Sequence, residues 1–306
     1  MDRFQHGHFV RLRSLVHGTY LHAAEDGESV TLSQPRASLN AAWAVHIYHG
    51  GDDDGVGYEY DYVGGEDDVF GNGYVGGQRL LLHSAAYGRY LAAAARPARL
   101  GHSGLRAELS DYNHPEMEAI MWRAVGSGFA DDVVLLRHVG GRHLRANGKY
   151  LPWNSSGVSV DDDASPMMYW VVESIPFRAA GMPVIPGPLP TRPRYLSAIF
   201  GSPGRWIRFV RALGDGYYPE EVDGHGWHQF WFSGRSVFRL RHDMASRLDG
   251  VVLYRQNIAM CVRAGRHGRL TPLVVDLPHG GYGETLEIVV LVAGTPGESL
   301  SPCPNF

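Results

Sequence analysis

The chain has 306 residues, and its 28 lysines and arginines are outnumbered by 32 aspartates and glutamates, for a net charge of −4 at pH 7. A net negative charge disfavours general binding to nucleic acid, and the lack of any run of about 18 apolar residues predicts no membrane-spanning helix. The only cysteines, Cys261 and Cys303, stand outside any Cys-x-x-Cys motif, and the first residues lack the apolar stretch of a secretory signal. We therefore expect a cytoplasmic or nuclear protein without a disulfide-linked partner.

One short pattern occurs three times in the first half of the chain. Each copy has a segment with alternating apolar residues, then a glycine, and then a second segment that starts with Tyr-Leu or His-Leu; the copies cover residues 10–21, 80–91 and 134–144. A period of two predicts strands, and the glycine between them predicts a turn, so each copy is expected to be a β-hairpin. An internal repeat of this kind indicates that one supersecondary unit is used three times.

Each copy ends at a tryptophan within an apolar run, at Trp43, Trp122 and Trp170. Because a hairpin cannot bury its apolar face alone, three units around a shared core predict an all-β trefoil over residues 1–176. A β-propeller is the alternative, although it needs about four blades or more. We expect the three tryptophans to lie in the core, each with its indole N–H bonded to a backbone carbonyl.

Two segments have the composition of connections. Residues 50–77 contain eight carboxylates and ten glycines but no lysine or arginine, which predicts a solvated acidic insertion between the first two repeats. Six prolines lie between residues 176 and 193, so we expect residues 177–193 to form an extended linker. The halves on either side are expected to fold separately, with docking of one onto the other as the alternative.

The second half contains both strand and helix patterns. Residues 237–248 have helical spacing, with Ser236 as the cap, and strand patterns occur at 206–211, 228–232, 258–262, 270–275 and 286–292. This order predicts a small α+β roll of the ubiquitin type over residues 194–294, followed by a tail at 295–306. A ferredoxin-like arrangement, which would differ by one helix, is the alternative.

The motifs of catalysis and of metal or cofactor binding are weak. Residues 71–76 match the spacing of a dinucleotide-binding loop, but acidic residues precede them and a strand pattern follows, which favours a plain glycine-rich loop. His6 and His8 stand outside any zinc spacing, residues 52–54 lack the alternation of a calcium loop, and Cys261 lies in an apolar strand pattern. We therefore predict that the protein is not an enzyme and binds no metal or cofactor.

Sugar binding is the alternative function for a trefoil. Trefoil lectins of the ricin type carry Gln-x-Trp in each repeat, whereas the residues at the glutamine position here are Ala41, Ile120 and Met168. A carbohydrate-binding module of this kind would therefore need a site that differs from the ricin type.

Basic side chains gather on the hairpin of the third repeat. Arginines on the solvent face of a hairpin can bind carboxylate or phosphate bidentately. The candidate residues for an anionic partner are Arg137, Arg142, Arg145 and Lys149, and His138 and His143 lie among them. The other interpretation is a solvated strand face that balances the acidic insertion.

Residues 10–14 and 18–23, the Ala-Ala-Trp sequence that ends at Trp43, and residues 261–273 together resemble the plant domain of unknown function 569 (DUF569) family. The resemblance implies a fascin-like trefoil of the actin-crosslinking type followed by a ubiquitin-like domain. It names F-actin as a partner by analogy of fold alone. We therefore expect a non-enzymatic, protein-binding or scaffold protein.

Overall fold

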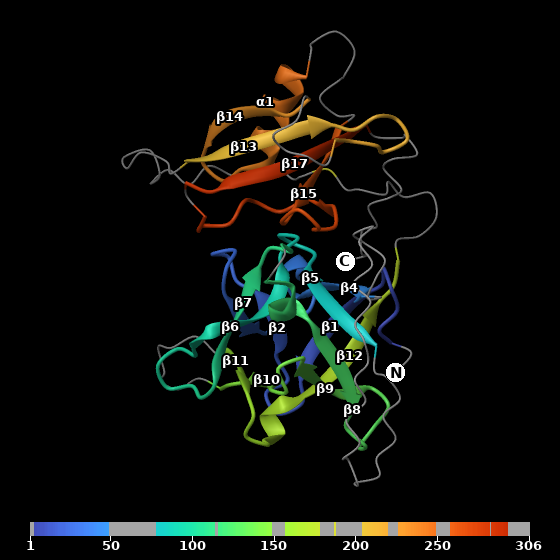
Figure 1. The fold of residues 1–306 in the computed structure, drawn as a ribbon, viewed down its shortest axis with the longest axis vertical. Helices are drawn as coiled ribbons and strands as arrows, with labels where there is room; N and C mark the ends of the chain where they lie inside the picture. Colours follow the sequence, from blue (N-terminus) through green and yellow to red (C-terminus); the bar gives the residue numbers. More distant parts are fainter. Residues whose placement is uncertain are drawn as a thin grey trace, which may run out of the picture.

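The computed structural model describes residues 3–48, 78–113, 116–148, 157–177, 187, 204–219, 226–248, 258–281 and 283–292. The predicted acidic insertion, most of the predicted linker and the tail lie outside the described residues. Figure 1 shows two bodies, a β-body from the first half of the chain and, above it, a sheet with one helix from the second half. No helix in the described part of the chain has both the length and the apolar character needed to cross a membrane.

Six strands of the first half close into a barrel in which each strand pairs antiparallel with the next and the last pairs with the first. They are β1 (Phe9–Ser14), β4 (Trp43–Tyr48), β5 (Arg79–Ser84), β8 (Trp122–Gly126), β9 (Val133–His138) and β12 (Tyr169–Ile175). The register repeats three times, because Trp43 pairs with Val10, Trp122 with Leu80 and Trp170 with Val134. A closed barrel leaves none of these strands with an open edge.

Three hairpins complete the first body, one for each predicted repeat. They are formed by β2 (Tyr20–Ala23) with β3 (Val30–Ser33), β6 (Tyr90–Pro97) with β7 (Leu105–Ser110), and β10 (His143–Ala146) with β11 (Val158–Asp161). A short 3-10 helix precedes each tryptophan strand: η1 (Leu39–Ala41), η2 (Glu116–Ile120) and η3 (Pro166–Met168). This threefold arrangement of barrel and hairpins is the trefoil that the repeats predict.

The three repeat tryptophans lie in the core with no exposed surface. Their indole N–H groups donate to equivalent carbonyls: Trp43 to Leu21 at 3.1 Å, Trp122 to Leu91 at 2.8 Å and Trp170 to Leu144 at 3.0 Å. Each bond joins the last strand of a repeat to its second strand, so the indole both fills the core and fixes the hairpin onto the barrel. The predicted role of the tryptophans is confirmed.

The glycine of each repeat turn has a backbone conformation that other residues rarely adopt. The φ angles of Gly18, Gly88 and Gly141 are 64°, 73° and 89°. Glycine reaches this region without steric cost, since it has no Cβ. The turn therefore explains why glycine recurs in the repeat.

The second half forms a five-stranded sheet with the order β14-β13-β17-β15-β16. Its strands are β13 (Gly204–Arg211), β14 (His228–Ser233), β15 (Ile258–Arg263), β16 (Thr271–Pro272) and β17 (Thr285–Val292). The central strands β13 and β17 run parallel, and the other neighbours are antiparallel. Each predicted strand pattern of this half is present, but the strand expected at 270–275 is only two residues long. Pro272 has no N–H to donate to a ladder, which explains the early end.

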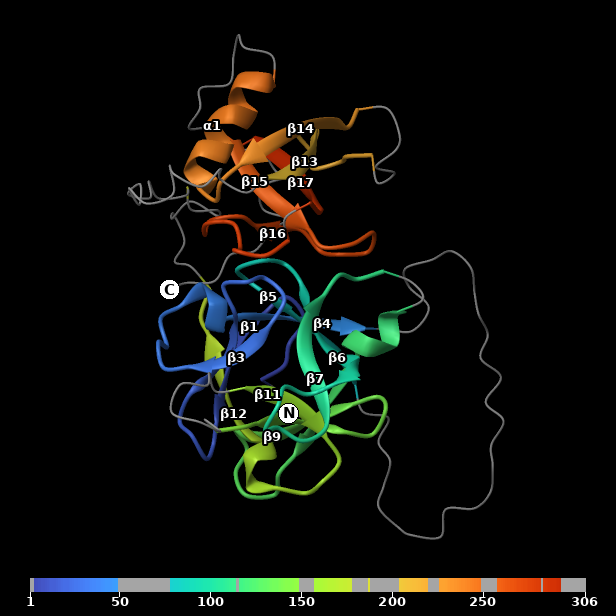
Figure 2. The same ribbon diagram turned by 90° about the vertical axis from the view of Figure 1, so that its left-hand side faces the viewer.

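Helix α1 (Val237–Arg247) covers one face of this sheet, as Figure 2 shows. The Ser236 hydroxyl accepts a hydrogen bond from the Arg239 N–H at 3.3 Å, which satisfies one of the free donors of the first turn. Leu240 and Met244 are buried against Ile207 and Phe209 of the sheet. The predicted helix and its cap are confirmed.

Candidate functional site

The two bodies are joined through the segment that leads from β15 through β16 toward β17. Figure 2 shows β16 between the rest of its sheet and the trefoil. The Tyr112 N–H donates to the Ala264 carbonyl at 2.9 Å, and the His267 N–H donates to the Tyr112 carbonyl at 3.1 Å. The His279 N–H likewise donates to the Glu25 carbonyl at 2.6 Å. Main-chain bonds of this kind dock the second body on loops of the trefoil, which is the alternative to two separate halves.

Gly265 makes this contact sterically feasible. Its φ is 88°, and a Cβ at this position would lie 2.6 Å from the Tyr112 carbonyl oxygen and 2.7 Å from the Tyr112 nitrogen. Only glycine combines this backbone conformation with so close an approach of another main chain.

Arginine side chains from both halves lie where the two bodies meet. Arg89 of the trefoil pairs with Asp111 at 3.0 Å and reaches across to Glu284 at 3.0 Å. Arg205 of the second body is buried and donates to the carbonyls of Pro278 at 2.8 Å and Gly280 at 3.0 Å. Because each guanidinium has several partners, these arginines fix loop positions as well as charge.

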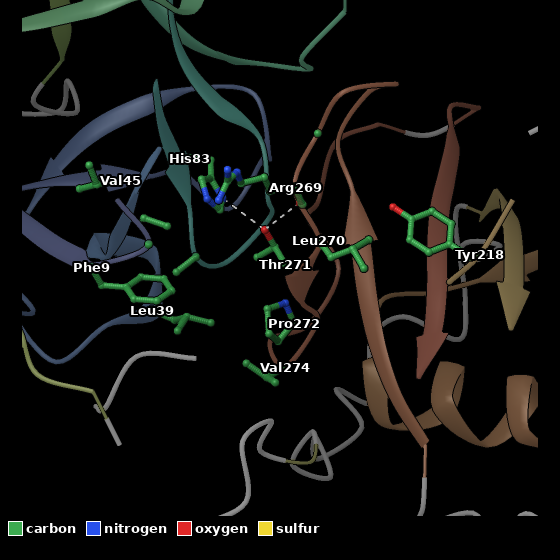
Figure 3. Close-up of a pocket in the computed structure, with 14 residues that line it drawn as sticks. Phe9, Leu39, Val45, His83, Tyr218, Arg269, Leu270, Thr271, Pro272 and Val274 are labelled. Carbon is green, nitrogen blue, oxygen red and sulfur yellow. Dashed lines mark hydrogen bonds between the residues drawn. The ribbon is translucent and has the colours of Figure 1, made fainter. Parts of the chain in front are cut away.

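A cavity of about 200 Å³ lies between the two bodies (Figure 3). The trefoil contributes mostly apolar walls and one histidine, including Phe9, Leu39, Val45, His83 and Ala85. The facing wall comes from the second body and includes Tyr218, Arg269, Leu270, Thr271 and Val274. Largely apolar cavities with a few convergent polar groups are the usual form of small-molecule sites.

His83 is a buried polar residue of the cavity wall. Burial, together with the weaker effect of the positive charge of Arg269, lowers the pKa of His83 to about 3. The ring is therefore neutral near pH 7. Its Nδ1 lies 3.3 Å from the Thr271 hydroxyl, a hydrogen bond that crosses from one body to the other.

Arg269 supplies the charge at the cavity. Its backbone N–H donates to the Tyr90 hydroxyl at 3.1 Å, while its side chain is exposed. No other described residue forms an ion pair or a hydrogen bond with its guanidinium. Figure 3 shows Arg269, His83 and Thr271 together at one side of the cavity.

The basic residues predicted as an anion site lie on the third repeat, and those that the structure describes have partners there. Arg145 donates to the Asp161 carboxylate at 2.7 Å and to the Ser103 hydroxyl at 3.1 Å. Burial alone would raise the pKa of Asp161, but hydrogen bonds from Ser103, neighbouring backbone and Arg145 hold it below its ordinary value.

The other two described arginines of this set are less firmly held. The Arg142 guanidinium lies 4.0 Å from the Asp162 carboxylate, and Arg137 donates to the Gly141 carbonyl at 3.3 Å. Lys149 lies outside the described residues. Arg145 is therefore paired with Asp161, whereas Arg137 and Arg142 remain available to an anionic partner. Binding of such a partner at this hairpin stays a prediction.

The repeats themselves carry one sign of the interdomain site. His83 occupies the position of Arg13 in the first repeat and Arg137 in the third, and all three pair with the first residue of the following strand. Arg13 and Arg137 keep contact with solvent, whereas His83 is buried. Loss of the arginine at one of three equivalent solvent-facing positions indicates that this face of the second repeat is covered.

A second notable surface lies on the sheet of the second body, on the face opposite α1. Trp206 of β13 and Trp231 of β14 are directly opposite in the register, with ring centroids 5.5 Å apart and planes at 75°. Their exposed fractions are 41% and 50%. Figure 1 shows β13 and β14 on the side of the sheet away from the trefoil, so docking leaves this pair open.

Within the described residues, no group of three or more His, Cys, Asp and Glu side chains is arranged to hold a metal ion. Cys261 lies on β15 as a buried thiol with no exposed surface. It therefore packs as a core side chain, as its apolar surroundings in the sequence predict.

Comparison with solved structures finds similarity at low identity. An SDF2-like protein from Arabidopsis thaliana is 14% identical over 56% of this chain and 94% of its own, with a TM-score of 0.43. A protein of unknown function from Caenorhabditis elegans is 16% identical over 56% of this chain and 97% of its own, also at 0.43. A ricin B-like lectin from Macrolepiota procera, solved with lactose, is 14% identical over 55% and 96%, at 0.38. Likeness at this level says nothing about what the present chain binds.

No curated protein matches the chain significantly. Two protein families do match, and they match in sequence order. Residues 1–53 match the beta-trefoil domain of unknown function (DUF569), and residues 203–291 match the DUF569 associated ubiquitin-like domain. These matches agree with the trefoil and with the mixed sheet and helix that follow it, and the chain therefore belongs to the DUF569 family.

Proposed function

We propose that this protein is a non-enzymatic binding protein that holds a protein partner on the exposed sheet face of its ubiquitin-like half. The observation that carries the proposal is the pair formed by Trp206 and Trp231. Tryptophan is strongly enriched among the residues that dominate binding energy at protein interfaces. Two adjacent, half-exposed indoles form an anchor that a single surface aromatic would not provide.

The pair is held in a fixed arrangement, which favours recognition. Gly204 lies next to the Trp231 indole, and a Cβ at Gly204 would come within 2.4 Å of that ring. The indole of Trp231 therefore rests on glycine backbone at the start of β13. A preformed aromatic surface loses little side-chain entropy when a partner binds.

Polar side chains border the tryptophan pair on the same face of the sheet. In the register, Gln229, Arg208 and Glu287 follow one another across three strands, and the next residue, Arg263, is buried. Arg263 and Glu287 form an ion pair at 2.9 Å. An apolar centre with a polar border is the usual composition of an interface between proteins.

In this proposal the trefoil acts as a rigid support for the sheet that carries the binding face. It contacts the β15–β16 side of the sheet, and β13 and β14, which carry the tryptophans, lie at the other side (Figure 1). A partner bound at that face would be held at a defined distance from the trefoil loops. This arrangement suits a scaffold protein, and F-actin remains the partner that family resemblance suggests for the trefoil half.

Affinity purification from cells, compared between wild type and the double variant W206S/W231S, tests the proposal. We expect specific partners to be lost from the double variant, and each recovered partner should bind the purified wild-type protein in titration calorimetry with at least about tenfold higher affinity than the variant. F129S is the matched control, since Phe129 is 71% exposed on the trefoil. If the partners bind the double variant and the wild type with equal affinity, this face is not their binding site. Binding to a glycan array that depends on the tryptophans would favour the carbohydrate alternative.

A further inference from the structure

We propose that the cavity between the trefoil and the ubiquitin-like half binds a small carboxylic acid with an apolar ring. This inference is independent of the protein-binding face proposed above, because none of the cavity residues belongs to that face. Three properties of the cavity lead to the ligand class: its size, the composition of its walls and the arginine that lines it.

The size limits the ligand to a small molecule. The cavity volume is about 200 Å³, whereas a cavity of about 150 Å³ with apolar walls is known to accept benzene. A single ring with a short substituent fits this volume, and a nucleotide or an oligosaccharide does not.

The walls favour an apolar ring. Phe9, Leu39 and Val45 face the cavity from the trefoil, and Leu270 and Val274 face it from the other half (Figure 3). A ring placed between them would remove apolar surface from water on both sides.

The polar end favours a carboxylate. The Arg269 guanidinium lines the cavity, carries a permanent positive charge and has no partner among the described residues. A guanidinium matches the two oxygens of a carboxylate in a bidentate arrangement. His83 is neutral and Thr271 carries an uncharged hydroxyl, so neither repels an anion beside Arg269.

The position of the cavity gives the ligand a consequence for the whole molecule. Because both halves line the cavity, a ligand bound there would contact both halves and would lose its contacts with one of them when the halves separate. A ligand that binds only the docked state stabilises that state in proportion to its occupancy. Binding of the acid should therefore raise the melting temperature of the full chain.

Titration calorimetry and thermal melting of the full chain test the proposal with three probes: benzoate, phenylacetate and cyclohexanecarboxylate. We expect at least one to bind, to raise the melting temperature, and to bind about tenfold more tightly than its neutral amide. R269Q should remove the preference for the acid over the amide. R266Q is the matched control, since Arg266 is an exposed arginine of the same loop that does not line the cavity.

A second variant tests the place of binding rather than its charge. V274F adds a ring to the cavity from a half-buried position on the ubiquitin-like side, and it should abolish binding of acid and amide alike. Binding that V274F leaves unchanged would place the ligand elsewhere and overturn the proposal. The same conclusion follows if none of the three acids binds at millimolar concentration, or if R269Q retains the full preference for the acid.

Discussion

His83 of the trefoil and Thr271 of the ubiquitin-like half meet across the boundary between the two folds, with the His83 Nδ1 3.3 Å from the Thr271 hydroxyl. Both side chains are buried. His83 on β5 of the second repeat thus lines the interdomain cavity and also forms one side of the docking contact. A substitution of His83 or Thr271 should therefore alter both the stability of the docked molecule and the affinity for a ligand in the cavity.

The pH dependence of stability should report on His83. Its folded-state pKa is about 3, against 6.5 for an unperturbed histidine. Below pH 6.5 the unfolded chain gains a proton that the folded chain does not, so this contribution to stability is complete above pH 6.5 and is lost as the pH falls toward 3. The expected loss between pH 7 and pH 5 is about 2 kcal/mol.

Urea unfolding of wild type and H83Q at pH 7 and pH 5 measures this contribution. Glutamine keeps a hydrogen-bonding group but does not titrate, so the variant should lose about 2 kcal/mol less than wild type between the two pH values. Comparing the two proteins cancels the titration of the other histidines. Equal losses in both proteins would show that His83 titrates normally in the folded state.

The three repeat tryptophans have equivalent geometry, so replacing any one of them should change the free energy of unfolding by a similar amount. W43F, W122F and W170F each remove an indole N–H that is bonded to a buried leucine carbonyl and leave a small cavity. We expect each to lower the free energy of unfolding by about 2 to 4 kcal/mol. W231F, at an exposed position, should stay within about 0.5 kcal/mol of wild type. A large difference among the three core variants in urea unfolding would mean that the threefold packing is only approximate.

The sequence predicted the parts of this fold that depend on local patterns. Trp43, Trp122 and Trp170 recur at one place in each repeat, and the period of two with a glycine turn identifies hairpins without any knowledge of their neighbours. The helix that starts after Ser236 was predictable for the same reason, since cap and apolar spacing lie within a few residues of each other.

The interdomain site has no such local signature. His83 and Thr271 are 188 residues apart in the chain, and the loop that carries Arg269 is placed by main-chain bonds to Tyr112 and its surroundings. A contact of this separation depends on the packing of two complete folds, which propensity and spacing do not describe. The basic cluster of the third repeat was evident as a run of charges, but the sequence did not show that Arg145 forms an ion pair with Asp161.

Actin binding is a direct test of what the family resemblance suggests. If the protein binds F-actin, a single copy should decorate filaments without bundling them, because crosslinking needs two separate filament sites and the chain contains one trefoil. High-speed sedimentation with F-actin would then carry the protein into the pellet, while low-speed sedimentation would leave the filaments in solution. Failure to pellet at tens of micromolar would remove actin from the candidate partners, and pelleting at low speed would indicate two sites or a dimer.

Two glycines with the same backbone conformation separate the strain of a substitution from the contact between the halves. Gly265 and Gly283 have φ angles of 88° and 89°, but a Cβ at Gly265 would meet the Tyr112 backbone at 2.6 Å, whereas a Cβ at Gly283 would have no atom within 4 Å. G283A should lower the free energy of unfolding by about 1 to 2 kcal/mol through its backbone conformation alone. G265A should cost at least about 2 kcal/mol more, since the main chain of Tyr112 cannot move away without breaking its bonds to Ala264 and His267.

Urea unfolding and limited proteolysis of the two glycine variants distinguish the outcomes. If docking is a stable part of the fold, G265A should unfold at lower urea concentration than G283A and should expose the residues between 264 and 281 to protease under native conditions. G283A should keep the protease resistance of wild type in that segment. Equal stability and equal resistance of the two variants would mean that the close approach of Gly265 to Tyr112 contributes nothing in solution, and that other contacts between the halves, such as Arg89 with Glu284 and His279 with Glu25, hold them together.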